Sequence, residues 1–158
     1  MTDTGGYLQT QQRLRLLHGY IGRQPVPYIA DAGGLTPSGG VNASAQDLLH
    51  WLEALLDLRS TPLRDALQLS LQLTGRPGAP FCQLSLGWQY FEPRHWYWHS
   101  GSAVGFKSFM GFSRRHQLGV VILANARIQG FKMEPLGMQI LALLESRQQQ
   151  LSTKASAP

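Results

Sequence analysis

Hydrophobic residues alternate with polar ones along much of the C-terminal half of the chain. Four runs rich in aromatic and β-branched side chains are separated by short polar stretches, at residues 84–91, 96–100, 106–112 and 118–124. This period of two predicts four strands. The run 118–124 is apolar on both faces, so we expect it to be the most buried strand. The connection over residues 113–117 is short enough for a hairpin, which favours antiparallel pairing.

Three other segments show the spacing of an amphipathic helix. The first follows Ser44, whose hydroxyl is placed to cap the helix, and Asp47 in the first turn favours the helix dipole. Three leucines then recur at helical spacing. A second helix is expected to begin at residues 61–62, where threonine precedes proline, and a third at residues 134–135, where glutamate precedes proline.

This order of helices and strands predicts an α+β fold, an antiparallel sheet of about four strands covered by helices on one side. A chain of 158 residues is long enough for one domain with a substantial core, which we place at residues 1–147. The parts expected are a long ordered loop region at 1–41, a helical region at 42–73, the sheet at 84–125 and a C-terminal helix at 134–147. The tail at 148–158 is expected to fray.

Composition narrows the classes of function. The net charge is +5, but Lys and Arg are scattered, so we expect no nucleic-acid surface. No apolar run approaches the length of a membrane span, and no glycine-rich phosphate-binding motif occurs, so we expect no membrane span and no cofactor. The single cysteine, Cys82, cannot form an internal disulfide. The first residues lack the basic and apolar parts of a signal peptide, which favours the cytoplasm for the chain as written.

Candidate chemistry gathers where the aromatic run 96–98 gives way to small residues. His99, Ser100, Gly101 and Ser102 form a plausible wall of a binding site, and the alternative is an ordinary strand end. Neighbouring residues on a strand point to opposite faces, so His99 is not placed to activate Ser100. His95 and His99 would lie about 13 Å apart on one strand, too far for a shared metal ion. We therefore expect no metal site.

Four segments of the sequence form an ordered set. They are Gly39-Gly40 leading into the capped helix, Leu86-Gly87-Trp88, His99-Ser100-Gly101-Ser102 followed by Gly105-Phe106, and the run from Leu118 to Asn125. Together they resemble the C-terminal part of the serine β-lactamase-like family, in its class C β-lactamase, esterase and D-aminopeptidase branch. The resemblance extends from Met1 to about Glu145, and Met1–Thr4 is similar to the loop after the family's second catalytic motif.

The resemblance implies a helical region beside a five-stranded antiparallel sheet with a C-terminal helix packed on it. His99-Ser100-Gly101 matches the family's third active-site motif, a Lys-Thr-Gly or His-Ser-Gly triplet. By that match, His99 and Ser100 would hydrogen-bond the substrate carboxylate or assist proton transfer, and the N–H of Ser102 would donate to the oxyanion hole. Asn125 matches an asparagine that lies near the substrate carboxylate in the family.

The other two motifs of the family do not occur in this sequence. No serine has a lysine three residues later, and no tyrosine or serine stands two residues before an asparagine. The leading interpretation is therefore a truncated homologue that is inactive alone, with no catalytic residue assigned, and that binds a small acyl or peptide-like ligand at the His99 wall. Two alternatives are half of a composite hydrolase completed by another chain, and a non-catalytic interaction domain that uses an exposed sheet edge.

The missing part of the family fold has a consequence for the strand at 118–124. Without the family's N-terminal strands, this apolar strand would have an unpaired edge, which promotes association unless it is covered. We therefore expect a homo-oligomer that buries this edge. Members of the family are often exported, whereas this chain shows no signal.

Overall fold

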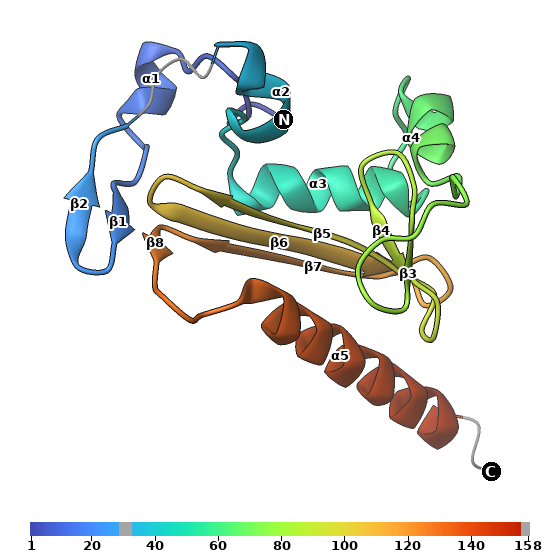
Figure 1. Cartoon of the computed structure of the whole chain (residues 1–158). Coiled ribbons are helices and arrows are strands. Elements are labelled where there is room, and N and C mark those ends of the chain that lie inside the picture. The colour runs from blue at the N-terminus through green and yellow to red at the C-terminus, as the bar shows by residue number, and fades with distance from the viewer. Residues whose placement is uncertain (29–32, 156–158) are drawn as a thin grey trace.

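The described part of the computed structural model comprises residues 1–28 and 33–155. It is an α+β fold with a five-stranded antiparallel sheet between two helical layers, as Figure 1 shows. The helices are α1 (Thr10–Arg13), α2 (Thr36–Gly39), α3 (Ala45–Leu55), α4 (Arg64–Ser70) and α5 (Met133–Ala155), with a 3₁₀ turn η1 (Gly33–Leu35). The strands are β1 (Gly19–Ile21), β2 (Gln24–Val26), β3 (Cys82–Leu84), β4 (Gln89–Phe91), β5 (Trp96–Ala103), β6 (Phe106–Ser113), β7 (Leu118–Ala124) and β8 (Ala126–Arg127).

The large antiparallel sheet has the order β3-β4-β5-β6-β7, with the five strands that the resemblance implies and one more than the four strands expected from the sequence pattern. The run predicted as one strand at 84–91 is a hairpin of β3 and β4. Gly87 adopts a left-handed φ of 95° in its turn, and the N–H of Ser85 donates to the carbonyl of Trp88 at 2.9 Å. Glycine tolerates this conformation, so the chain reverses where the sequence pattern continues.

Helices cover both faces of the sheet, not one face as the element order predicts. On the α3 side, Leu52, Leu55 and Phe112 belong to one buried cluster. On the α5 side, Phe109 and Leu141 belong to a second. The sheet is therefore an inner layer, and side chains of β6 contribute to both cores.

Strand β6, rather than β7, is the most buried strand. Phe109 and Phe112 of β6 are 1% and 0% exposed, whereas β7 has one buried residue, Val120. A strand with neighbours on both edges and helices on both faces loses more water contact than a strand at the edge. The apolar composition of β7 does not reveal its place in the strand order.

The N-terminal region contains short elements rather than one long loop. Strands β1 and β2 form a hairpin, and β1 pairs in parallel with β8 beyond the end of β7. The segment before it is attached to the loop ahead of α3 by paired backbone hydrogen bonds between Gly5 and Asn42, each 3.0 Å long.

Two helix starts were predicted with different success. The hydroxyl of Ser44 accepts a hydrogen bond from the N–H of Asp47 at 3.1 Å, which confirms the predicted cap of α3. The second helix begins at Arg64, later than the predicted 61–62, because Thr61 accepts instead from the N–H of Leu63 in the preceding turn. Helix α5 continues to residue 155, so most of the tail predicted to fray from residue 148 is helical.

Candidate functional site

The predicted wall lies on the second half of β5, where the strand loses one neighbour. Strand β4 pairs with β5 only from Trp96 to Trp98, whereas β6 pairs with it as far as Ala103. The backbone of residues 99–103 therefore has an outer edge that no strand of the described chain occupies. His99 is exposed beside this edge. The arrangement offers main-chain donors and acceptors next to an imidazole.

The predicted residues of the wall divide between the two faces of the sheet. His99 has the parity of Tyr97, which packs on the α3 side. Ser100 has the opposite parity, and its Oγ donates to Oε1 of Glu134 on α5 at 2.5 Å. The structure thus separates the imidazole of His99 from the hydroxyl of Ser100, as expected for adjacent strand residues.

The Ser100 hydroxyl is held by a carboxylate that the sequence analysis assigned only to a helix start. The hydrogen bond from Ser100 lowers the pKa of Glu134 below its ordinary value, against the opposing effect of burial, and the positive charges of Lys107 and Lys132 assist. Thirty-four residues separate Ser100 from Glu134, and no local pattern connects them. This bond joins β5 to the first turn of α5.

Gly101 and Ser102 complete the segment. A Cβ on Gly101 would lie 2.7 Å from the hydroxyl oxygen of Ser108 on β6, so glycine leaves room for the cross-strand neighbour. Ser102 is exposed and lies opposite Lys107 in the β5–β6 ladder. The ammonium group of Lys107 donates to the carbonyl of Phe131 and lies over its ring.

Asn125 lies at the end of β7, two strands away from His99 in the sheet order. Its Nδ2 donates to the carbonyl of His18 at 3.1 Å, and its own carbonyl accepts from the N–H of Tyr20 at 2.9 Å. These bonds attach the β1–β2 hairpin to the sheet. The structure does not bring Asn125 together with the residues of the β5 segment.

A second buried carboxylate organises the N-terminal segment. Asp47 is 4% exposed and accepts from the N–H of Asp3 at 2.7 Å and the hydroxyl of Thr4 at 2.8 Å. Burial raises the pKa of this carboxyl, but the hydrogen bonds from Thr4 and the Asp3 N–H outweigh it, and the pKa lies below its ordinary value. The sequence indicated Asp47 as a residue of the helix start and not as an anchor for residues 3 and 4.

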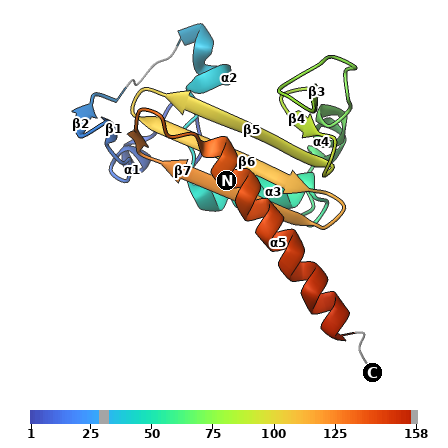
Figure 2. The same ribbon diagram turned by 60° about the horizontal axis from the view of Figure 1, so that its bottom comes forward.

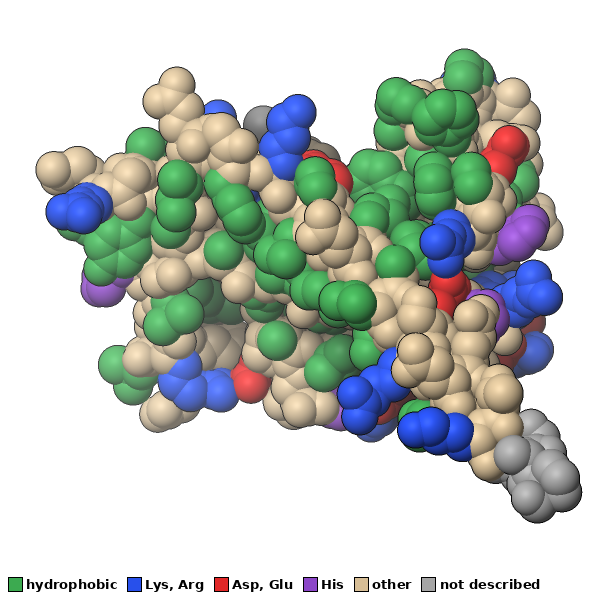
Figure 3. All heavy atoms as spheres, turned by 90° about the horizontal axis from the view of Figure 1, so that it is seen from below, with side chains coloured by type: hydrophobic (Ala, Val, Ile, Leu, Met, Phe, Trp, Pro, Cys, Tyr) green, Lys and Arg blue, Asp and Glu red, His purple; other side chains and the backbone are tan. Residues whose placement is uncertain are grey.

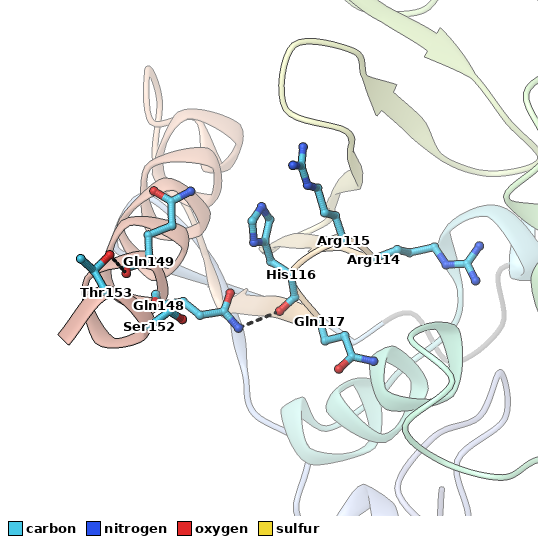
Figure 4. A pocket seen from close by; sticks show the side chains of 8 residues that line it. All are labelled: Arg114, Arg115, His116, Gln117, Gln148, Gln149, Ser152 and Thr153. Atoms are coloured by element: carbon cyan, nitrogen blue, oxygen red, sulfur yellow. Dashed lines mark hydrogen bonds between the residues drawn. The ribbon is translucent and has the colours of Figure 1, made fainter. Parts of the chain in front are cut away.

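A hollow of about 610 Å³ lies away from the β5 segment, between the β6–β7 turn and the C-terminal half of α5 (Figure 4). Gln148 joins the two sides of the hollow, because its Nε2 on α5 donates to the carbonyl of His116 in the β6–β7 turn at 3.1 Å. Arg114 points away from α5 in this view and pairs with Asp57 at 3.6 Å. Polar and charged residues line the hollow, and it does not coincide with the predicted site.

Metal sites and membrane spans are two other classes of feature to consider in residues 1–28 and 33–155. No group of three or more His, Cys, Asp or Glu side chains is placed to hold a metal ion. No helix in the same ranges has the length and hydrophobicity needed to cross a membrane.

Comparisons with known proteins identify the fold. The family model described as Beta-lactamase matches residues 1–145, and no curated protein matches the chain. A crystal structure of a class C β-lactamase superposes with a TM-score of 0.77 at 17% identity, over 90% of this chain and 48% of that protein. The β-lactamase/D-alanine carboxypeptidase from Pseudomonas syringae superposes with a TM-score of 0.68 at 23% identity, over 78% of this chain and 44% of that protein.

A third solved structure, the D-alanine carboxypeptidase AmpC from Burkholderia cenocepacia, gives a TM-score of 0.71 at 22% identity, over 80% of this chain and 46% of that protein. The chain thus spans less than half the length of each of these three proteins. At 17–23% identity, the superpositions establish the fold alone. The family is established by the family model, because it matches most of the sequence. This chain belongs to the Beta-lactamase family and corresponds to part of its fold.

Proposed function

We propose that this chain is a truncated homologue of the β-lactamase-family serine hydrolases that has no hydrolytic activity alone and keeps one ligand-binding wall. The observation that carries the proposal is the outer edge of β5 at residues 99–103, which lacks a paired strand in the described residues and lies near α2, beside the exposed imidazole of His99. An extended ligand with an amide backbone can pair with such an edge. The ligand class that fits is therefore a small acyl or peptide-like molecule.

The proposed lack of activity follows from the sequence and from the local geometry. No serine of the chain belongs to a Ser-x-x-Lys motif. The Ser100 hydroxyl donates to a carboxylate whose pKa is lowered, and a carboxylate in that state is a weak base. Neither His99 nor a lysine is paired with Ser100 in the described contacts, so this serine lacks the partner that activates a nucleophile.

Intact-mass spectrometry after incubation with a fluorophosphonate, and separately with a penicillin, tests the absence of a nucleophile. We expect an unchanged mass while circular dichroism shows a folded protein. A stable single adduct would contradict the proposal, because it would identify an activated serine.

Titration of the protein with the same penicillin, followed through the imidazole NMR signals, tests the wall. We expect His99 to shift and the variant His99→Ala to lose binding. The control is His95→Ala, because His95 is also exposed but lies in the turn before β5. Equal binding by both variants would place the ligand elsewhere.

A second candidate is half of a composite hydrolase. The chain spans only 44–48% of the solved relatives described above, which favours a partner that supplies the remaining part of the fold. Penicillin hydrolysis that appears only after this chain is combined with a polypeptide carrying Ser-x-x-Lys would support this candidate. Hydrolysis by neither the chain nor the mixture would count against it.

We also propose that the chain forms a homo-oligomer through the edge of its sheet. The position of β7 at one end of the strand order supports this assembly.

A third candidate is a non-catalytic interaction domain that uses the exposed sheet edge to capture a strand of a partner protein. Retained partner binding in a variant with both His99 and Ser100 changed to alanine would support this candidate.

A further inference from the structure

The hollow of about 610 Å³ between the β6–β7 turn and α5 has no part in the ligand wall. Figure 2 shows α5 crossing the sheet obliquely, so that its C-terminal half extends past the end of the sheet. The hydrogen bond from Nε2 of Gln148 to the carbonyl of His116 joins the helix to the turn. Both walls of the hollow thus belong to the described part of this chain, and a direct contact holds them together.

The side chains that line the hollow favour an anion. Two arginines, one histidine and three glutamines line it together with one serine and one threonine, and no acidic side chain is among them. Figure 3 shows Lys and Arg side chains gathered around the C-terminal part of α5. Guanidinium and amide N–H groups donate hydrogen bonds to oxyanions, and a charged donor strengthens them.

Arg115 is the cation best placed to bind a ligand in the hollow. The neighbouring Arg114 pairs with Asp57 at 3.6 Å and points away from α5 in Figure 4. Arg115 is exposed, and within residues 1–28 and 33–155 it forms no ion pair. Figure 4 shows Arg115 and Gln149 extending to the same side of the hollow from its two walls. A guanidinium can form two parallel hydrogen bonds with a phosphate group.

A buried carboxylate near the hollow does not oppose an anion there. An oxygen of Glu145 lies 3.7 Å from Nε2 of His116. The same carboxylate accepts from Nε1 of Trp96 and from Arg94, the latter at 3.3 Å. Because Arg94 compensates the charge of Glu145, the positive charge of Arg115 remains available to a ligand.

Gln148 supplies an acceptor beneath these donors. Its side-chain oxygen is buried and has no hydrogen-bond partner among residues 1–28 and 33–155. The orientation of the amide is set by Nε2, because the carbonyl of His116 can only accept. A buried acceptor without a donor is costly. Arg115 and Gln149 are exposed, and exposed side chains change rotamer within nanoseconds, so the lining can open for a ligand that carries its own hydroxyl.

We propose that this hollow binds inorganic phosphate, which joins the β6–β7 turn to α5. Arg115 and the side-chain amide of Gln149 donate to the phosphate oxygens, and the hydroxyl of phosphate donates to Oε1 of Gln148. Phosphate keeps a proton at neutral pH, whereas sulfate has the same shape and no proton. The acceptor therefore selects phosphate over sulfate. This site lies apart from the ligand wall and does not rest on the proposed function.

NMR titration of the isotopically labelled chain with inorganic phosphate, in chloride at constant ionic strength and neutral pH, tests the site. We expect saturable shifts of the side-chain amide signals of Gln148 and Gln149. Sulfate should bind at least about fivefold more weakly, because it leaves the Gln148 oxygen without a donor. Arg115→Ala should weaken phosphate binding at least about tenfold, because a charged donor is lost.

Arg23→Ala is the matched control. Arg23 is also exposed and forms no ion pair in the described part of the chain, but it lies in the β1–β2 turn, at the other end of the molecule from the hollow (Figure 1). The control removes the same charge and should bind phosphate as wild type does. Equal weakening by Arg115→Ala and Arg23→Ala would show that net charge, and not this hollow, attracts phosphate.

A further variant tests the selecting oxygen. Gln148→Met is similar in size and lacks the acceptor, so it should lose the preference for phosphate while circular dichroism shows a folded protein. The comparison of phosphate with sulfate on wild type does not depend on this variant folding, and equal affinities there would overturn phosphate as the ligand. The absence of saturable shifts at α5 and the β6–β7 turn, or unchanged phosphate binding by Arg115→Ala, would overturn the site.

Discussion

The carboxylate of Glu145 offers a sharp test of how α5 is held to the sheet. Glu145 is 3% exposed and accepts a hydrogen bond from Nε1 of Trp96, which is itself 3% exposed. Arg94 donates to the same carboxylate at 3.3 Å, and Nε2 of His116 lies 3.7 Å away. The perturbation that we consider is Glu145→Leu, which removes the acceptor and keeps an apolar side chain.

The size of the effect depends on which donor can recover a partner. The Arg94 side chain is 51% exposed, so water replaces the lost carboxylate and the cost is small. The indole N–H of Trp96 has no access to water, and an unsatisfied buried donor costs about 1–3 kcal/mol. Removal of a buried charge can itself be favourable, but the orphaned N–H persists. We therefore expect Glu145→Leu to destabilise the fold by about 1–3 kcal/mol.

Urea unfolding followed by circular dichroism measures this change, at one protein concentration because association shifts apparent stability. Glu145→Gln keeps an acceptor for the indole and should cost less than Glu145→Leu. In a Trp96→Phe background the N–H is absent, so the further change Glu145→Leu should cost at least about 1 kcal/mol less than in wild type. An equal cost in both backgrounds would refute the reasoning.

Three further predictions follow from other contacts. Gly137→Ala should destabilise by about 1–3 kcal/mol in urea unfolding despite the helix propensity of alanine, because the added Cβ would lie 2.2 Å from the Phe109 ring. Ser100→Ala should raise the pKa of Glu134, measured by carboxyl NMR, because the donor that lowers it is removed. Asp47→Asn should reduce the acid sensitivity of stability. The folded pKa of Asp47 lies below its ordinary 3.8, so its contribution is present above that pH and is lost as the pH falls through the folded value.

Each of these three has a control or a contradicting outcome. Gly39→Ala introduces a Cβ with nothing within 4 Å and should be neutral or stabilising; equal destabilisation of both glycine variants would refute the packing argument. An unchanged Glu134 pKa in Ser100→Ala would mean that the Ser100 bond does not control it. Identical acid unfolding of wild type and Asp47→Asn would show that the hydrogen bonds to residues 3 and 4 do not hold the carboxylate charged.

Much of the fold could be predicted because the signals are local. The alternation of apolar residues located β5, β6 and β7, and the Ser44 hydroxyl located the start of α3. The break between β3 and β4 depends on the left-handed conformation of one residue, Gly87, inside an otherwise continuous apolar run. The period of two cannot report such a reversal.

The candidate site was harder to predict because its contacts are between distant segments. The sequence indicated the segment 99–102 as a candidate site and predicted that the side chains of His99 and Ser100 point to opposite faces of the strand. It did not indicate that Ser100 is held by Glu134, or that Asn125 anchors His18. Both contacts depend on where α5 and the β1–β2 hairpin reach the sheet, and local spacing carries no such information.

The two cores explain how part of a larger fold can hold together and where it remains incomplete. Phe112 with the α3 side and Phe109 with the α5 side each form a buried cluster, and both aromatic rings come from β6. The sheet is therefore supported across its thickness by this chain's own helices. Lateral support is different, because within residues 1–28 and 33–155 β6 has a strand on each side whereas β7 has a strand on one side only. The helices therefore bury the faces of β7, but they do not pair the backbone donors and acceptors on its outer side, because only a strand can continue the ladder.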